Sequence, residues 1–372
     1  MKILMVPTWY SAYDAEIITA GIFHYEQSVA LLKHADVAVY FPYDTTVGKS
    51  FYQGMEKGLL TFRRGKRIKF ISPILYVWDF VKICKTFKPD IIHGHVAAGA
   101  GVVATLLGKL FSIPVVITEH SPIEMMNFDD ASFVRRVSTV YKNSVANICV
   151  SKNLCERLQE HLNGIKFSTI YNGVIDPVQI QNDKCKYALD GAVNCCIVGS
   201  FYSKDIKGYQ FLLPAVKELL DQGEKIILHI CGGGEYLDFY KEMSHELGIS
   251  ENCVFYGNCN KEKVYSIMAQ MEFCISASLY ESAGVSVQEA LLLGKPVLVT
   301  KSGGANSLVN DEVAVIVDKG STEALIHGIN KIVTQIDKYD ADVIRGYAIE
   351  NFEMSKVTEQ YMKLYNAIVN KQ

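Results

Sequence analysis

Two glutamates, Glu281 and Glu289, flank a turn of small residues that opens a predicted helix. The carboxylate of Glu281, placed before the helix, can accept hydrogen bonds from sugar hydroxyls. That of Glu289, inside the helix, can accept hydrogen bonds from two ribose hydroxyls. Acidic residues also occur near helix starts simply because they interact favourably with the helix dipole. Taken alone, the two glutamates fit a sugar-nucleotide site and a plain helix start equally well.

The residues between these glutamates could bring the backbone close to a diphosphate. Ala283 and Gly284 are small enough to let a ligand approach the chain. The N–H groups of the first helical turn, near Val285 and Ser286, have no partner within the helix and would point at the phosphates.

Two loops after other predicted strands carry further candidates. Lys207 stands at a strand-to-helix loop, where its ammonium group could neutralise a diphosphate leaving group. Gly232 and Gly233 follow another apolar strand, and a glycine backbone can approach a base or a phosphate closely. This glycine run is neither the dinucleotide fingerprint nor the phosphate-binding loop. A surface lysine and a plain tight turn are the alternatives.

Histidines end two predicted strands of the first half. His120 follows one apolar strand, and His93 and His95 end another. A histidine at the carboxyl end of a strand can donate to a sugar hydroxyl or assist charge development, although lone histidines are more often structural. Gly21, at the start of the first predicted helix, could present its N–H group to a phosphate.

Apolar strands and amphipathic helices alternate along the whole chain. Short apolar strands without polar alternation indicate parallel sheets covered by helices on both faces, and two such series indicate two doubly wound domains. The predicted helices are 21–34, 73–87 and 99–111. The predicted strands are 3–6, 37–41, 91–94, 115–118 and 147–150, then 195–198, 226–231, 253–256, 273–276, 296–300 and 314–317.

The turn signals in residues 171–177 predict the boundary between the domains. We expect an acceptor-side domain over 1–173 and a donor-binding domain over 174–351, with a terminal helix at about 352–372 that packs back on the first. Ligands bind at the carboxyl ends of strands in such sheets. The two domains are therefore expected to face a central cleft.

Composition excludes several other classes of protein. The chain has 372 residues, 49% of them hydrophobic, and a net charge of -3. It contains no apolar run long enough for a transmembrane helix and no apparent signal peptide. Its ten cysteines show no metal-binding spacing. We therefore expect a cytoplasmic protein with reduced thiols, no metal site and no nucleic-acid partner.

A basic segment interleaved with apolar residues follows Glu56. This pattern suits an anionic membrane face or a phosphate-bearing acceptor, and a solvated loop and strand is the alternative. Contact with the inner face of the plasma membrane would use Arg63, Arg64, Lys66, Arg67 and Lys69.

The motifs together resemble the retaining glycosyltransferases of the large group-four family, which have the two-Rossmann-domain GT-B architecture. The resemblance covers nearly the whole chain and is closest to bacterial members that build capsular, exopolysaccharide or O-chain glycans. Its most specific part is the pair of glutamates at 281 and 289, followed by Gly303-Gly304. The other matching segments are 20–27, 90–95, 117–120, 172–174 and 207–208.

The resemblance implies a role for each matching residue. Glu281, His120 and Lys207 match the family's catalytic positions, and Lys207 is its diphosphate lysine. Glu289 matches the ribose acid, and Gly21 matches the phosphate-contacting glycine. The family needs no metal or other cofactor, since the nucleotide-sugar donor, most often a UDP-sugar, is a substrate.

Three departures from the family pattern bear on the donor. Ser200 stands where members commonly carry arginine, and Lys204 or Lys207 alone would supply the positive charge. Ala283 stands where phenylalanine is usual, which would leave a roomier pocket. The glycine run at Gly232 and Gly233 replaces the usual Gly-Asp-Gly.

The reaction implied is transfer of a hexose-type sugar from a nucleotide diphosphate to an acceptor hydroxyl, with retention of the anomeric configuration. The acceptor would be a glycan or a lipid-linked glycan. One alternative is a nucleotide-sugar 2-epimerase of the same architecture. Another is a catalytically weak scaffold in a polysaccharide assembly complex, which Ser200 keeps open.

Overall fold

The structure is a computed structural model that describes residues 1–10, 21–44, 47, 51–65, 71–180 and 185–371. The chain forms two compact units. The N-terminal unit comprises the described residues of 1–173 together with residues 354–371, and the C-terminal unit comprises those of 174–353. Ten residues of the first loop, 11–20, lie outside the described residues, as do Lys66, Arg67 and Lys69.

The N-terminal unit is built on one sheet with the strand order β3-β4-β2-β1-β5-β6-β7-β8. Neighbouring strands run parallel, apart from the antiparallel pair β3 and β4. The bounds are β1 (Lys2–Val6), β2 (Asp36–Phe41), β3 (Tyr52–Glu56), β4 (Leu59–Arg63), β5 (Ile91–His95), β6 (Val115–Glu119), β7 (Ala146–Cys149) and β8 (Ser168–Thr169).

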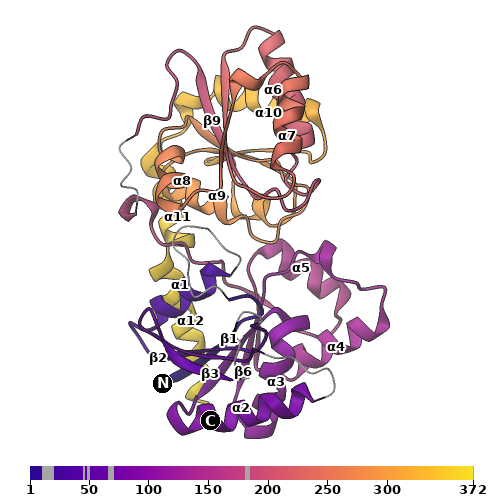
Figure 1. The fold of residues 1–372 in the computed structure, drawn as a ribbon, viewed down its shortest axis with the longest axis vertical. Helices are drawn as coiled ribbons and strands as arrows, with labels where there is room; N and C mark the ends of the chain where they lie inside the picture. The colour runs from indigo at the N-terminus through magenta and orange to yellow at the C-terminus, as the bar shows by residue number, and fades with distance from the viewer. Residues whose placement is uncertain (11–20, 45–46, 48–50, 66–70, 181–184, 372) are drawn as a thin grey trace. The chain divides into compact units, whose positions relative to one another are not determined.

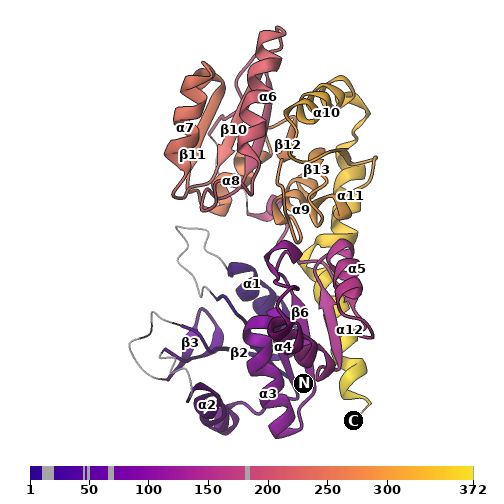
Figure 2. The same cartoon turned by 90° about the vertical axis from the view of Figure 1, so that its right-hand side faces the viewer.

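Helices cover both faces of this sheet. Figures 1 and 2 show α1 (Ile22–Leu31) and α12 (Met354–Val369) on one face and α2 (Ser72–Thr86), α3 (Val102–Phe111) and α4 (Ala131–Lys142) on the other. α5 (Lys152–His161) connects β7 to β8, and a π-helical segment, Val96–Gly101, precedes α3. Because both faces are covered, the central strands β1, β5 and β6 are buried along nearly their whole length, as expected of a parallel sheet.

The last helix completes the core of the N-terminal unit. Tyr361 and Tyr365 of α12 are buried against strand residues such as Ile3. The Tyr361 hydroxyl lies 3.2 Å from Thr118 Oγ1, and the Tyr365 hydroxyl lies 2.6 Å from Nδ1 of His93. Residues more than 240 positions apart in the sequence are therefore joined by buried hydrogen bonds.

The C-terminal unit is built on a parallel sheet with the order β11-β10-β9-β12-β13-β14. Figure 1 shows α6, α7 and α10 on one face and α8, α9 and α11 on the other. The strands are β9 (Val193–Val198), β10 (Ile226–Cys231), β11 (Cys253–Gly257), β12 (Phe273–Ser276), β13 (Val297–Thr300) and β14 (Ala314–Val317). The helices are α6 (Tyr209–Asp221), α7 (Leu237–Glu246), α8 (Lys261–Met268), α9 (Val285–Leu292), α10 (Thr322–Thr334) and α11 (Ala341–Phe352).

The predicted elements are confirmed, and so is the α/β class with two doubly wound sheets. Every expected strand is present, with ends that differ by one or two residues. The expected helix over 21–34 is shorter, and the one over 99–111 starts as a π-helical segment. The hairpin of β3 and β4 was not expected, because its turn lies in the charged segment. Lys57 and Gly58 form that turn with positive φ of 44° and 83°.

The two arginines expected to contact a membrane are engaged in ion pairs instead. Arg63 pairs with Asp44 at 2.7 Å and with Glu56. Arg64 is buried and donates to Asp79, which has no exposed surface and also accepts from the Tyr40 hydroxyl at 2.8 Å. For these two arginines the contacts correct the prediction, because neither guanidinium group is available to lipid head groups, whereas for Lys66, Arg67 and Lys69 it stays a prediction.

We expect Arg64→Met to lower the free energy of unfolding of the N-terminal unit by about 3 kcal/mol, because it leaves the buried carboxylate of Asp79 without its counter-charge. Chemical denaturation followed by fluorescence measures the change. Arg135→Met, at an exposed position of α4, is the matched control. An unchanged midpoint for Arg64→Met would contradict a buried pair.

Candidate functional site

The C-terminal sheet fixes where ligands can bind in that unit. Its strand order reverses between β9 and β12, so the connections after these strands cross to opposite faces and leave a crevice at their carboxyl ends. The loop after β9 carries Lys207 and leads into α6. The loop after β12 carries Glu281 and leads into α9. Both predicted catalytic residues therefore belong to the switch point of the sheet.

Lys207 and Glu281 form an ion pair there. The Lys207 ammonium donates to Oε2 of Glu281 at 3.1 Å and lies 3.5 Å from Oε1. The side chains are 25% and 19% exposed, so a ligand can reach both. The loop after β9 can come this close to the end of β12 only because residue 208 is a glycine. It has φ +76°, and a Cβ atom on it would lie 2.0 Å from the carbonyl oxygen of Ala277.

The backbone of Glu281 is held by the loop after β13. Its N–H group donates to the carbonyl of Ser302 at 3.0 Å, and its carbonyl accepts from Gly304 at 2.6 Å. The sequence motif Gly303-Gly304 thus has a structural purpose, since any larger residue at Gly304 would collide with the chain at Ser282. This loop fixes where the Glu281 carboxylate emerges.

The start of α9 agrees with the predicted anion-binding turn. The helix begins at Val285, after Gly284 with φ 79°, and no described side chain caps it. The N–H groups of Val285 and Ser286 therefore stand at the positive end of the helix dipole. Ala283 is 3% exposed and packs against the Gly304 loop, so it forms no wall of an open pocket in this conformation.

Glu289 lies inside α9, on its buried side. Its carboxylate is 8% exposed and accepts a hydrogen bond from the Tyr265 hydroxyl of α8 at 2.8 Å. Tyr265 was not predicted from the sequence, because a tyrosine in an amphipathic helix gives no sign of its partner. The tyrosine orients the carboxylate that the resemblance assigns to ribose.

The glycine run after β10 packs against its own chain. The N–H group of Gly232 donates to the carbonyl of Gly257 at 2.9 Å, and a Cβ atom on Gly232 would lie 1.9 Å from the carbonyl oxygen of Gly199. The carbonyl of Gly233 accepts from Phe201. The amide of Gly232 is therefore not available to a phosphate, whereas the ligand contact expected of Gly233 stays a prediction.

Lys204 and Ser200 lie in the loop after β9, and both are exposed. The ammonium group of Lys204 lies 4.2 Å from the ring centre of Phe239, on α7. Lys207, and not Lys204, is thus the cation that the structure brings to Glu281.

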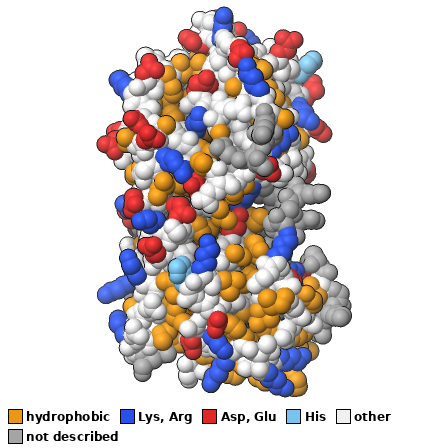
Figure 3. Space-filling model, turned by 90° about the vertical axis from the view of Figure 1, so that its left-hand side faces the viewer, with side chains coloured by type: hydrophobic (Ala, Val, Ile, Leu, Met, Phe, Trp, Pro, Cys, Tyr) orange, Lys and Arg blue, Asp and Glu red, His pale blue; other side chains and the backbone are white. Residues whose placement is uncertain are grey.

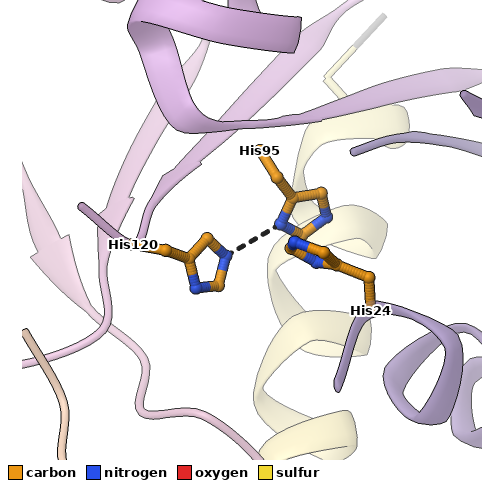
Figure 4. Close-up of side chains that lie close together, drawn as sticks. All are labelled: His24, His95 and His120. Atoms are coloured by element: carbon orange, nitrogen blue, oxygen red, sulfur yellow. Dashed lines mark hydrogen bonds between the residues drawn. The ribbon is translucent and has the colours of Figure 1, made fainter. Parts of the chain in front are cut away.

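In the N-terminal unit, three buried histidines meet at the corresponding switch point, between β1 and β5. His95 ends β5, His120 follows β6, and His24 lies on α1. Nδ1 of His95 is 3.0 Å from Nε2 of His120, and the ring of His24 lies 4.3 Å from that of His95 and 5.0 Å from that of His120 (Figure 4). His24 was not predicted from the sequence, since its spacing from the others gives no signal.

Burial keeps these imidazoles neutral. Desolvation lowers the pKa of His120 and of His93 to about 3, and holds the pKa values of His24 and His95 well below the ordinary value. His93 is a structural residue, because its two nitrogens contact Thr118 and Tyr365.

The backbone beside His120 is anchored by Glu119. This carboxylate is 1% exposed and accepts from the N–H groups of Ala97, His120 and Ser121 and from the Tyr141 hydroxyl. A cavity of about 260 Å³ opens beside His120, lined largely by apolar side chains such as those of Trp9, Met125 and Phe133.

Gly21 precedes α1 with φ 93°, and a Cβ atom on it would lie 2.7 Å from the carbonyl oxygen of Trp9. The loop that joins these two residues, 11–20, is outside the described residues. The phosphate contact expected for Gly21 therefore stays a prediction.

Comparisons with known proteins agree with this architecture. Residues 34–176 match the family model Glycosyltransferase Family 4, and residues 185–346 match the model Glycosyl transferases group 1. The uncharacterized glycosyltransferase MJ1178 of Methanocaldococcus jannaschii is 28% identical over 320 residues, which cover 84% of this chain and 82% of that protein. Alpha-monoglucosyldiacylglycerol synthase of Streptococcus pneumoniae is 24% identical over 250 residues, covering 63% of this chain and 56% of that protein.

Among solved structures, HepE of Anabaena in complex with UDP has the same fold. It covers 99% of this chain and 100% of its own, with a TM-score of 0.77 at 18% identity. The two doubly wound sheets are therefore those of a GT-B protein, as the sequence predicted. The Family 4 model thus matches most of the N-terminal unit, and the group 1 model matches most of the C-terminal unit.

Proposed function

We propose that this protein transfers a hexose from a UDP-sugar to a hydroxyl group of a glycan or lipid-linked glycan, with retention of the anomeric configuration. The observation that carries the proposal is the Lys207–Glu281 pair beside the uncapped start of α9. A sugar diphosphate needs a cation and free N–H groups for its phosphates and a carboxylate for its sugar hydroxyls. This switch point brings all three together. HepE, which has the same fold, binds UDP.

In the proposed reaction, each partner of the ion pair exchanges its present contact for one with the donor. Lys207 and the N–H groups of Val285 and Ser286 stabilise the negative charge that develops on the leaving diphosphate. Glu281 accepts hydrogen bonds from the hydroxyls of the transferred sugar. Because the pair is partly exposed, its own interaction is weak and the donor can displace it.

His120 is the proposed sugar-contacting residue of the N-terminal unit. At neutral pH its imidazole is neutral, since burial lowers its pKa to about 3. It can therefore accept or donate a hydrogen bond but brings no positive charge to the oxocarbenium-like centre. No metal ion takes part at the diphosphate in this proposal, because Lys207 and the helix start supply the charge.

Lys207→Ala should reduce kcat/KM for donor-dependent UDP release by about 100- to 1,000-fold, the loss typical of removing a charge-stabilising donor. Lys204→Ala, in the same loop, should reduce it by less than about threefold, because that side chain packs on Phe239. A coupled UDP-release assay with and without acceptor measures both. Equal losses for the two lysines would refute the assignment of Lys207.

Glu289 is proposed to hold the ribose. Glu289→Gln should raise KM for the donor by roughly tenfold with little change in kcat, since uniform binding is lost. Tyr265→Phe should act in the same direction and more weakly, because it removes the 2.8 Å hydrogen bond that orients the carboxylate. Steady-state kinetics and donor titration separate the two parameters. A fall in kcat at constant KM would show that Glu289 acts in the chemical step.

We also propose that the protein works in the cytoplasm at an anionic membrane surface, and that α2 is the contact. Ile74, Trp78 and Val81 lie on one stripe of this helix and are 61%, 64% and 44% exposed. Lys82 and Lys85 are exposed beside them, and the only acid of α2, Asp79, is buried. An apolar stripe with tryptophan and flanking lysines is typical of helices that lie in a membrane interface.

The surface of the N-terminal unit is locally hydrophobic. Figure 3 shows hydrophobic side chains gathered on one face of the N-terminal unit, with Lys and Arg side chains along its rim. None of the helices in the described part of the chain has the length and apolar character needed to cross a bilayer. The contact would therefore be peripheral. It would bring the enzyme to a lipid-linked acceptor.

Replacing Lys82 and Lys85 together by Gln should weaken binding to phosphatidylserine-containing vesicles roughly 30-fold, since each lysine near the surface contributes about 1 kcal/mol. Trp78→Ser should weaken it as well. Val343→Ser, at a 54% exposed position of α11, is the control for a surface valine. Vesicle sedimentation gives the affinities. Equal binding of wild type to neutral vesicles, or unchanged binding of the α2 variants, would refute the proposal.

A further inference from the structure

The three histidines at the N-terminal switch point have more ring nitrogens than the proposed sugar contact uses. One ring nitrogen from each of His24, His95 and His120 lies within 4.8 Å of the other two. Among the described residues, neither nitrogen of His24 has a hydrogen-bond partner, and the same holds for Nε2 of His95 and Nδ1 of His120. Buried polar atoms without partners are rare in folded proteins.

We propose that His24, His95 and His120 bind one transition-metal cation of the imidazole-preferring class, of which Zn²⁺ is the representative. Neighbouring ligand nitrogens around a tetrahedral zinc ion lie about 3.4 Å apart, and the two closest nitrogens here are already 3.0 Å apart. One nitrogen of each of the three rings lies within 4.8 Å of the other two, and Figure 4 shows the His24 ring beside those of His95 and His120. His93 is excluded, because both its nitrogens are engaged.

The surroundings suit a cation. All three imidazoles are buried, so a bound ion would be shielded from bulk water. When the ion binds, the hydrogen bond between Nδ1 of His95 and Nε2 of His120 breaks, and its proton moves to the outer nitrogen of the same ring, so that both inner nitrogens present lone pairs. The cavity beside His120 offers a route for entry and space for water as a fourth ligand.

A bound ion would compete with the sugar for the imidazole of His120. This consequence rests on the proposed function, whereas the binding itself does not. Micromolar Zn²⁺ should therefore inhibit UDP release, and a chelator should restore it. His24→Phe should remain active but become insensitive to zinc, because His24 contributes to the metal site alone.

The experiment is a titration of the chelator-treated full chain with Co²⁺, without donor or acceptor. Three imidazole ligands predict visible ligand-field bands at one Co²⁺ per chain, which Zn²⁺ abolishes. His24→Phe should weaken the affinity at least about 100-fold, while His245→Ala, at an exposed histidine of α7, should leave it unchanged. If His24→Phe does not fold, His95→Phe tests the same site.

Two outcomes would overturn the proposal. One is the lack of any such bands in wild type. The other is binding that persists in His24→Phe and disappears in His245→Ala, which would indicate a surface site. A protein that binds Co²⁺ through the cluster but releases no UDP would uphold the metal site and refute the proposed function, so the two failures are distinguishable.

Discussion

Both candidate sites depend on one constraint, the reversal of strand order in a parallel sheet. Where neighbouring strands send their connections to opposite faces, no crossing element covers their carboxyl ends, and polar side chains can gather there. In the C-terminal unit this occurs between β9 and β12, which present Lys207 and Glu281. In the N-terminal unit it occurs between β1 and β5, and His95 lies at that point. The same geometry thus creates two sites of different chemistry.

The two sites differ in how they hold charge. The C-terminal site leaves an ion pair partly in water, where it is weak and can be exchanged for a charged ligand. The N-terminal site removes its imidazoles from water, so they stay neutral, while Glu119 is fully compensated by backbone N–H groups. A mobile diphosphate suits the first arrangement. The second arrangement suits imidazoles that bind a ligand in their neutral form.

Residues at the ends of strands could be predicted from the sequence better than contacts between distant elements. The positions of Lys207, Glu281 and His120 after strands could be predicted, because apolar strands are easily recognised and their ends share one edge of a sheet. His24 and Tyr265 could not, since their partners are set by strand order and helix packing. Gly232 was interpreted as a ligand contact because glycine permits a close approach both to a ligand and to the protein's own backbone. The sequence does not distinguish the two cases. The ion pairs of Arg63 and Arg64 could not be predicted, because they depend on which strands become neighbours, and the membrane contact of Lys66, Arg67 and Lys69 stays a prediction.

The return of α12 to the N-terminal unit affects the order in which the chain can fold during synthesis. The C-terminal unit is contiguous in sequence, so its sheet can close once residue 353 has left the ribosome. The N-terminal sheet emerges first, yet the pocket for Tyr361 and Tyr365 stays open until the last helix arrives. The half that is made first is therefore the half that is finished last, and the apolar residues that α12 covers stay exposed while the other half is being translated.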